Sequence, residues 1–241
     1  MGTKPKSSEL NPGPGFRVNM SISRLDNSLV KQFSQFLTTD ISDLMNRLYT
    51  MSWSIKNLVN NQCILGTAIT VKVFPGDNLM VHKALDIAQP GDIIVIDASS
   101  TPMNAVIGDL VAQKAQHRGI AGFIVDGLIR DLKGIQEIGI PVFARGTTPI
   151  GPLHRGPGEI NYPVSCGGIV VNPGDIIMGD KDGVIVIQQQ SAPDILKRAY
   201  QQQESLADYI ANVKKGIFSN DWVDQQLADS GCIIHSDHDS A

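Results

Sequence analysis

The chain has 241 residues, 42% of them hydrophobic, which is enough to bury one sizeable core. Its net charge is −4 and it has no long basic run, so the composition does not indicate a nucleic-acid partner. No apolar stretch approaches the roughly 20 residues of a membrane helix, and no secretory signal is visible, so we expect a cytoplasmic protein that does not bind membranes. The three cysteines lack metal-type spacing and are typical of reduced structural thiols.

Three parts are predicted along the chain. Residues 1–20 are rich in Lys, Ser, Pro and Gly and are expected to form a flexible arm. Residues 21–190 are expected to form the domain, beginning with a helical pattern over 23–48 in which Asp40 is a candidate cap. Residues 66–74 alternate between apolar and polar side chains like a strand.

The middle of the domain alternates between apolar runs and helical patterns. We predict a strand over 92–97, a loop over 99–104, a helix from 108 to about 117, a strand over 121–125, a turn at 126–127, a helix over 128–138 and a strand over 140–143. Strands joined by helices run parallel, so both helices should begin at the carboxyl edge of the sheet, where ligands of open α/β sheets bind.

The last part contains two more predicted strands, a long helix and a polar tail. The strands span 168–171 and 183–187, and residues 191–241 hold the helix, from 192 to about 215, and the tail. Packing of this helix on its own core and packing on another subunit are equally compatible with the pattern. Its candidate apolar stripe consists of Ile195, Ala199, Leu206, Tyr209 and Val213.

Three charged residues at the predicted helix starts carry the most functional information. Asp109 is followed by a twenty-residue spacer and then by the adjacent pair Arg130 and Asp131. Asp131 offers oxygen ligands of the kind that Mg²⁺ or Mn²⁺ prefers, and Arg130 can clamp a carboxylate with two parallel hydrogen bonds. Asp109 can hold a metal-bound water or relay a proton. The structural alternative for Asp109 and Asp131 is that each merely complements a helix dipole. The structural alternative for Arg130 is a surface ion pair.

The start of the first of these helices is also a candidate anion site. Gly108 leaves room for close approach to the backbone, and a helix N-terminus binds anions. A substrate carboxylate could therefore rest on the amides of Gly108, Asp109, Leu110 and Val111. His82 is a weaker candidate, for which a structural role is the default interpretation.

These motifs resemble those of a known family. Gly108-Asp109, Asp126-Gly127 and Arg130-Asp131 are similar to the family of 4-hydroxy-4-methyl-2-oxoglutarate/4-carboxy-4-hydroxy-2-oxoadipate aldolases, which also contains the RNase E inhibitor RraA. The resemblance covers roughly residues 40–187 and includes the segments 75–78, 81–84, 90–92, 140–142 and 179–183.

The resemblance implies a fold, an assembly and one further site residue. The fold would be a compact layered α/β sandwich of the swivelling-domain type with a central, partly parallel sheet. The protein would assemble as a homotrimer or homohexamer with its sites between subunits. Glu204 stands about where the family carries a glutamate that reaches the site of a neighbouring subunit. Because most helical glutamates face solvent, a surface role for Glu204 is the alternative.

Three functions compete on this basis. The preferred hypothesis is a divalent-metal-dependent aldolase that cleaves a 4-hydroxy-2-oxo acid to pyruvate and a second carbonyl compound, with oxaloacetate decarboxylation as a side activity. The alternative is a non-catalytic regulator that binds a ribonuclease, and the presence of Asp131 favours the enzyme. A methyltransferase is disfavoured because no glycine-rich S-adenosylmethionine loop is present. The sequence does not fix the physiological substrate.

Overall fold

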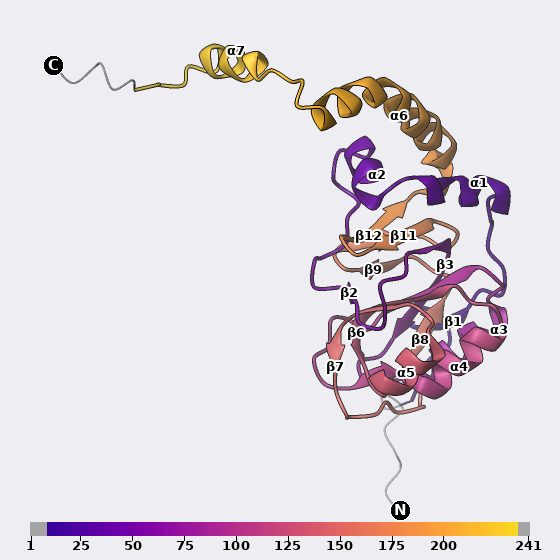
Figure 1. Ribbon diagram of the computed structural model, residues 1–241. Helices are drawn as coiled ribbons and strands as arrows, with labels where there is room; N and C mark the ends of the chain where they lie inside the picture. The colour runs from indigo at the N-terminus through magenta and orange to yellow at the C-terminus, as the bar shows by residue number, and fades with distance from the viewer. Residues whose placement is uncertain (1–8, 236–241) are drawn as a thin grey trace, which may run out of the picture. The chain divides into compact units, whose positions relative to one another are not determined.

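The computed structural model of the protein describes residues 9–235, in two units (Figure 1). The first unit ends at Ala199 and the second begins at Tyr200. Residues 1–8 of the expected arm and residues 236–241 of the expected tail lie outside the described part of the chain. No helix within residues 9–235 is long and apolar enough to cross a membrane.

A mixed, mostly parallel sheet forms the centre of the first unit. Within the described residues it has ten strands, in the order β1-β8-β3-β4-β6-β7-β2, with β5 beside β6, β11 beside β3 and β12 beside β11. The pairs β3–β4, β4–β6, β5–β6 and β6–β7 are parallel, so the expected layered α/β class is confirmed. The strands are β1 (Phe16–Val18), β2 (Lys56–Asn57), β3 (Ile64–Val73), β4 (Asp92–Asp97), β5 (Ala105–Ile107), β6 (Gly122–Ile129), β7 (Val142–Thr147), β8 (Gly158–Ile160), β11 (Ile176–Asp180) and β12 (Gly183–Ile187), and β9 (Val164–Cys166) pairs separately with β10 (Ile169–Val171).

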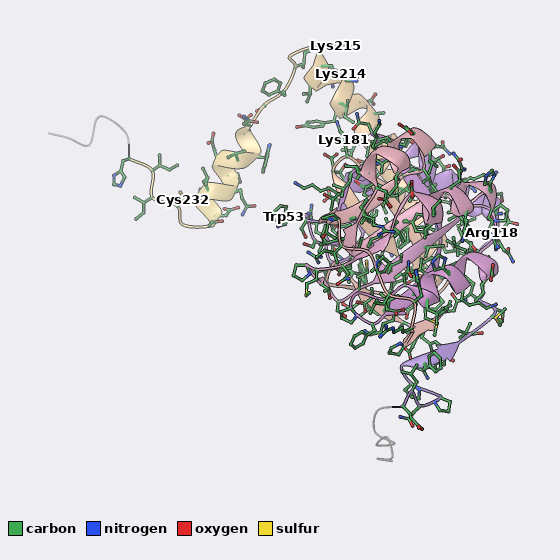
Figure 2. All side chains as sticks on the ribbon, turned by 90° about the horizontal axis from the view of Figure 1, so that it is seen from below. Trp53, Arg118, Lys181, Lys214, Lys215 and Cys232 are labelled. Carbon is green, nitrogen blue, oxygen red and sulfur yellow. The ribbon has the colours of Figure 1, made fainter. Side chains whose placement is uncertain are left out.

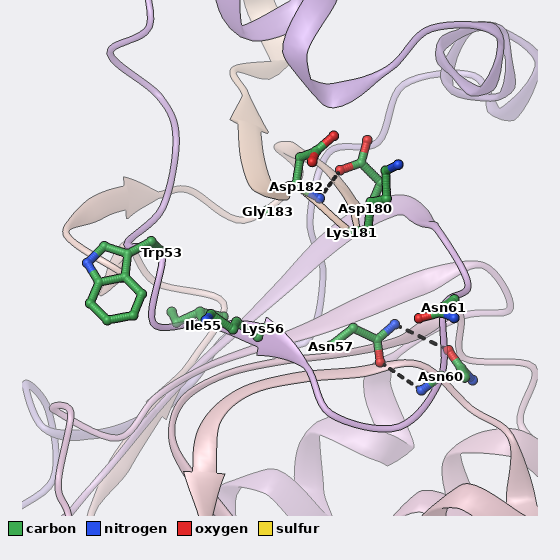
Figure 3. Close-up of a pocket in the computed structure, with 10 residues that line it drawn as sticks. All are labelled: Trp53, Ile55, Lys56, Asn57, Asn60, Asn61, Asp180, Lys181, Asp182 and Gly183. Carbon is green, nitrogen blue, oxygen red and sulfur yellow. Dashed lines mark hydrogen bonds between the residues drawn. The ribbon is translucent and has the colours of Figure 1, made fainter.

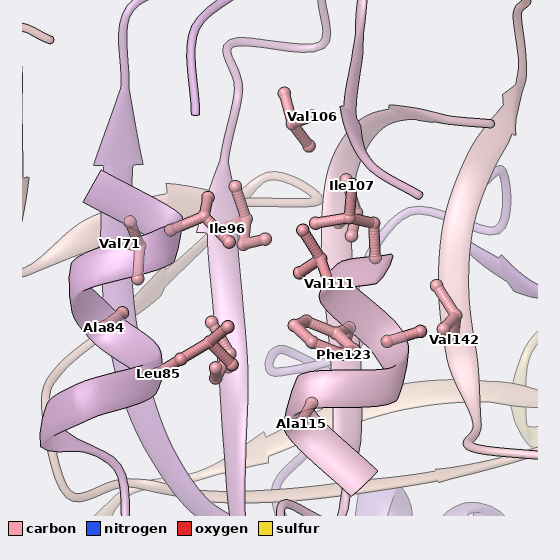
Figure 4. Packing of buried hydrophobic residues seen from close by; sticks show 14 of the residues in the cluster. Val71, Ala84, Leu85, Ile96, Val106, Ile107, Val111, Ala115, Phe123 and Val142 are labelled. Atoms are coloured by element: carbon pink, nitrogen blue, oxygen red, sulfur yellow. The ribbon is translucent and has the colours of Figure 1, made fainter. Parts of the chain in front are cut away.

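Three helices cover one face of this sheet. They are α3 (Leu79–Ile87), α4 (Asp109–His117) and α5 (Leu132–Ile138), and they follow β3, β5 and β6 in the chain (Figure 1). Each contributes buried apolar residues to one cluster with the sheet, among them Ile135 of α5. In Figure 4, Ala84 and Leu85 of α3 lie over the strands that carry Val71 and Ile96, and Val111 and Ala115 of α4 lie beside Phe123. The burial of these apolar faces holds the starts of α4 and α5 at the carboxyl edge of the parallel strands.

Two further clusters fill the rest of the first unit. One lies between the opposite face of the sheet and the β9–β10 pair and includes Ile124 and Phe143. The other contains residues of the β11–β12 hairpin, the N-terminal helices and the first turns of the last long helix. The N-terminal helices are α1 (Asn27–Gln32), the 3-10 turn Phe33–Gln35 and α2 (Thr38–Leu44). The long helix is α6 (Ala192–Lys214), which follows a second 3-10 turn, Gln189–Ser191, and contributes residues up to Ala199.

The second unit consists of the remainder of α6 and of α7 (Asp221–Asp229). None of its described residues is buried, and Lys214, Lys215 and Cys232 are among the side chains drawn for it in Figure 2. The predicted stripe of α6 divides at the boundary between the units. Ile195 and Ala199 are buried, whereas Leu206, Tyr209 and Val213 are exposed.

Several predicted elements differ from the structure. The predicted turn at 126–127 and the predicted helix start at residue 128 are wrong, because β6 continues to Ile129 and α5 begins at Leu132. Asp126 can remain in the strand because its buried carboxylate accepts hydrogen bonds from Arg145 and Ser100. Residues 16–18 of the expected arm form β1, and the predicted helix over 23–48 is interrupted between α1 and α2. The helix α3 and the short strand β5 had not been predicted.

Candidate active site

The end of β6 and the beginnings of α4 and α5 meet at one edge of the sheet. Gly108 precedes α4 in an extended conformation, and Arg130 follows β6 with its N–H donating to the carbonyl of Ile107 at 3.0 Å. Asp131 precedes α5 with a positive φ of 54°. Few residues other than glycine adopt this left-handed conformation, and Asp and Asn are among those that do. Ile107 and Arg130, which are 23 positions apart in the sequence, are thus neighbours.

Gly108, Arg130 and Asp131 are brought into direct proximity. Arg130 Nε lies 3.2 Å from Asp131 Oδ2, and the two side chains are 42% and 41% exposed. A Cβ atom at residue 108 would lie 2.4 Å from Asp131 Oδ2 and 3.3 Å from Arg130 Cγ. Only glycine leaves the space beside this carboxylate oxygen open.

A second glycine borders the Arg130 guanidinium from the loop between β7 and β8. A Cβ atom at Gly151 would lie 2.2 Å from Arg130 Nη1. Asn104 Nδ2 donates to the Gly151 carbonyl at 2.7 Å, and the Ala105 N–H donates to the Ile150 carbonyl at 2.8 Å. These two bonds hold the loop against the guanidinium.

The carboxylate of Asp109 lies on the α5 side of the same helix start. A Cβ atom at Gly134 would lie 2.9 Å from Asp109 Oδ2, so the side chain packs directly against α5. Asp109 Oδ1 accepts the N–H of Leu110 at 2.7 Å, which engages one of the four amides expected to bind an anion. Leu110 is exposed and the side chain of Val111 is buried in the core. A groove of about 410 Å³ runs past this carboxylate, and it is lined by Asp109, Leu110, Gln113, Gln116, Gly134, Glu137 and Ile138.

Glu204 lies in the exposed part of α6, which belongs to the second unit. Its predicted approach to a neighbour's site concerns another copy of the chain and stays a prediction.

The donor set at this edge is small. Within residues 9–235, no three side chains of His, Cys, Asp or Glu gather in an arrangement that could hold a metal ion. Asp131 therefore offers a single carboxylate. Mg²⁺ often binds proteins through one or two carboxylates and takes its remaining ligands from water and substrate. One half-exposed carboxylate beside an open space fits this mode of binding.

A histidine pair, formed by His82 of α3 and His154 of the loop between β7 and β8, was largely missed by the sequence interpretation. The rings of His82 and His154 meet edge to face, with centroids 5.5 Å apart. His154 Nδ1 lies 2.7 Å from Oδ1 of the buried Asn78, whose Nδ2 donates to the Val106 carbonyl at 2.9 Å. Asn78 and His154 are 76 residues apart, so no local pattern signals their contact. The segment 75–78 was noted, but only as part of a resemblance.

A buried ionic network lies around Asp126. Its carboxylate accepts hydrogen bonds from Arg145 Nε at 2.5 Å, Ser100 Oγ at 2.7 Å and the Gly167 N–H at 2.6 Å. Burial raises the pKa of Asp126, but the hydrogen bonds and the charge of Arg145 outweigh this effect and lower the pKa. Burial and nearby carboxylates raise the pKa of the Cys166 thiol well above its usual range, which makes that thiol unreactive.

A separate pocket of about 350 Å³ lies between the segment 53–61 and the β11–β12 hairpin (Figure 3). Its Asp180 carboxylate accepts hydrogen bonds from Thr38, and its Asn57 and Asn60 side chains fold the loop back on itself. Trp53, which is 80% exposed, borders the pocket. The Asn57, Asn60 and Asp180 side chains of this pocket therefore maintain local structure.

Comparison with known proteins identifies relatives of two kinds. Residues 38–186 match the family described as RraA-like, Aldolase/RraA. A protein of Halalkalibacterium halodurans with the provisional name 4-hydroxy-4-methyl-2-oxoglutarate aldolase is 43% identical over 76% of this chain and 87% of its own length. The 4-hydroxy-4-methyl-2-oxoglutarate aldolase of Thermus thermophilus is 30% identical over 63% of this chain and 92% of its own. The crystal structure of Streptomyces coelicolor RraAS2, described as an unusual member of the RNase ES inhibitor RraA family, superposes with a TM-score of 0.72 at 26% identity, over 78% of this chain and 98% of that chain.

Proposed function

Because the chain belongs to the RraA-like family of aldolases and RraA proteins, we propose that it is a divalent-metal-dependent aldolase. It would cleave a 4-hydroxy-2-oxo acid to pyruvate and a second carbonyl compound, with oxaloacetate decarboxylation as a side activity. The observation that carries this proposal is the half-exposed pair of Arg130 and Asp131, beside the space that Gly108 leaves open at Asp131 Oδ2.

Asp131 would hold the metal ion, Mg²⁺ or Mn²⁺. When bound, the ion supplies Lewis-acid stabilisation of the negative charge that develops on the 2-oxo group. The exposed Asp131 carboxylate can serve as a ligand without leaving a buried partner unpaired, because its neighbour Arg130 is equally exposed.

Arg130 would orient the pyruvate portion of the substrate. Its planar guanidinium can donate two parallel hydrogen bonds to a carboxylate or to the developing enolate oxygen. The contact with Gly151 limits its freedom, so that less side-chain entropy is lost when substrate binds.

Proton transfer completes the reaction. Cleavage removes the proton from the 4-hydroxyl group, breaks the bond between C3 and C4, and leaves the enolate of pyruvate, which is then protonated at C3. Asp109 would relay these protons or hold the water that carries them, because its carboxylate borders the open groove between α4 and α5. Glu204 of a second copy is the other candidate acceptor of the hydroxyl proton.

We further propose that a second copy covers this site in a homotrimer or homohexamer. Exposed apolar side chains accompany the charged residues along this edge of the sheet, which is a composition typical of an interface. They are Met103, Leu110, Ile150 and Leu153, which are 60%, 74%, 50% and 53% exposed.

Regulatory binding to a ribonuclease is the alternative, and the likeness to RraAS2 favours it. Binding of this kind needs neither a metal ligand at position 131 nor the space beside it. The alternative therefore predicts that Asp131→Ala leaves the affinity for the ribonuclease unchanged and that the wild type turns over no substrate.

The decisive test combines pyruvate release with hydrogen exchange. Pyruvate release from 4-hydroxy-4-methyl-2-oxoglutarate, and deuterium exchange into the methyl group of pyruvate, should both require Mg²⁺ or Mn²⁺ and stop with excess chelator. Asp131→Ala should lose both activities and remain folded, whereas Asp182→Ala, at an exposed turn, should keep them. Full activity in excess chelator would refute the proposal.

A further inference from the structure

The position of the Arg130 guanidinium depends on the backbone of Gly151. Among residues 9–235, the one polar partner of this side chain is Asp131, which lies 3.2 Å from Nε. Asp131 is also the proposed metal ligand, and a carboxylate shared with a metal ion attracts an arginine less strongly. The other close neighbours are two glycines: a Cβ atom would lie 3.4 Å from Arg130 Nε at Gly108 and 3.1 Å from Arg130 Cζ at Gly151.

The peptide unit between Gly151 and Pro152 has a single anchor. Because proline has no N–H, this unit can be fixed only through its carbonyl oxygen. The peptide units on either side of it each make a backbone hydrogen bond, of 2.8 Å and 2.7 Å. In the part of the chain that the structure describes, the Gly151 carbonyl instead accepts a side-chain donor, Asn104 Nδ2, at 2.7 Å. Removing that amide would leave the peptide unit beside the guanidinium unattached.

Asn104 is itself fixed to the sheet that carries Arg130. Its half-buried side chain lies against Gly76, where a Cβ atom would be 3.0 Å from Asn104 Oδ1. The next residue, Ala105, begins β5 and pairs with Leu128 of β6. Arg130 follows the end of β6. The Asn104 amide thus ties the irregular loop between β7 and β8 to the strands that place Arg130.

We propose that Asn104 is a positioning residue for Arg130. Its amide holds the Gly151 carbonyl, and Gly151 keeps the guanidinium in the orientation that binds the carboxylate of the pyruvate portion. This inference rests on the proposed aldolase function and adds a neutral residue that acts only through the arginine. Without the amide, the guanidinium would gain freedom that must be lost again when substrate binds.

A double-mutant cycle tests this role. Asn104→Leu keeps the branched shape of the side chain and removes the donor. It should lower kcat/KM for pyruvate release from 4-hydroxy-4-methyl-2-oxoglutarate about 10- to 100-fold, the loss typical of a binding group displaced by about 1 Å. In the Arg130→Lys background the same substitution should change kcat/KM about 2-fold or less, because an effect that passes through the guanidinium has already been lost.

A second readout does not need turnover. Oxalate has the planar shape of the pyruvate enolate, and its affinity in the presence of Mg²⁺ can be measured by calorimetry in the same four proteins. The affinity should show the same coupling between positions 104 and 130. The free energy of unfolding, measured with urea, should show none, because the exposed Arg130 contributes little to stability.

The matched control is a hydrogen bond of the same type elsewhere. Asn60 Nδ2 donates to the carbonyl of Gly139 at 2.9 Å and is also partly buried. Asn60→Leu should leave kcat/KM unchanged in both backgrounds, even where it lowers stability as much as Asn104→Leu. Asn104→Ala, which is smaller, takes the place of Asn104→Leu if the leucine variant does not fold.

The outcomes separate this inference from the proposed function. Equal losses of kcat/KM with arginine and with lysine at position 130 would overturn the inference, and so would an unchanged kcat/KM in folded Asn104→Leu. Both results leave the aldolase standing, because the wild type still cleaves its substrate. A wild type that binds oxalate without cleaving any substrate would refute the aldolase, and the cycle in oxalate affinity would then decide the inference alone. Absence of both cleavage and oxalate binding would overturn the two together.

Discussion

Two Asp–Arg pairs near one end of the sheet have opposite environments. The Asp126 side chain is 6% exposed and its carboxylate accepts three hydrogen bonds, from Arg145, Ser100 and Gly167. The Asp131 side chain is 41% exposed, and it lies 3.2 Å from an Arg130 that is just as accessible. The residue types are the same, and the number of partners differs.

The difference separates structural charges from available ones. Removing one member of a buried pair leaves the other charged and desolvated, so such a pair is fixed in place by the free energy of folding. An exposed pair contributes little to stability and can exchange partners at little cost. The Asp131 carboxylate and the Arg130 guanidinium are therefore available for the metal ion and the carboxylate that we propose they bind.

The largest expected effect comes from making the same substitution at both aspartates, which tests whether the two pairs differ in their contribution to stability. Asp126→Asn should lower the free energy of unfolding by about 3–5 kcal/mol, because it leaves the Arg145 charge unpaired. Asp131→Asn should change it by about 1 kcal/mol or less, since asparagine also tolerates a positive φ. Urea denaturation of both variants measures the difference. Similar losses in the two would show that exposure does not distinguish the pairs.

The second prediction sharpens the role of the exposed arginine. Arg130→Lys keeps the charge but lacks the planar fork, so transition-state stabilisation should fall by about 2–4 kcal/mol. The measurement is kcat/KM for pyruvate release. Arg155→Lys, an arginine in the loop between β7 and β8, is the control and should retain most of the activity. An unchanged kcat/KM in Arg130→Lys would remove this residue from the site.

The third prediction follows from the lowered pKa of Asp126. Because the folded-state pKa lies below the unfolded value of about 3.9, the stability gained from this carboxylate is fully present above that value and is lost as the pH falls through the folded pKa. The stability difference between wild type and Asp126→Asn should therefore shrink below about pH 4. Denaturation at neutral pH and at acidic pH measures this. A difference that grows on acidification would mean that the sign of the shift is wrong.

The smallest predicted signal concerns Glu204. If this residue completes the site of another copy, mixing inactive Asp131→Ala with inactive Glu204→Ala should restore partial activity, because some sites in mixed oligomers hold both intact residues. No recovery after demonstrated subunit exchange would mean that Glu204 acts within its own chain. A fully active Glu204→Ala parent would mean that it is a surface residue.

The sequence predicted well those parts of the fold that depend on local periodicity. The strand over 92–97 and the helix from 108 to 117 agree with β4 and α4, because turn signals or glycine border both segments. The turn predicted at Asp126-Gly127 failed because the partner that stabilises a buried aspartate, Arg145, stands 19 residues away. Tertiary hydrogen bonds overrode a local preference there.

The candidate site shows the same division. Parallel topology alone brings the starts of α4 and α5 together, so the proximity of Gly108, Arg130 and Asp131 could be anticipated from their positions in the sequence. The contact of His154 with Asn78 could not, because it depends on the path of an irregular loop. The hydrogen bond from the Leu110 N–H to Asp109 Oδ1 could not be anticipated either, because it depends on one side-chain rotamer.

The left-handed backbone of Asp131 has a consequence for how this position evolves. A residue with a side chain at a φ of 54° is strained by about 1 kcal/mol relative to glycine, which has no Cβ to clash. Selection for stability alone would therefore replace Asp131 with glycine, and the same replacement would remove the candidate metal ligand. If Asp131 holds the metal ion as proposed, a lineage that lost the reaction would be expected to drift away from aspartate here while its fold became more stable, so the identity of this residue should distinguish catalytic from non-catalytic descendants.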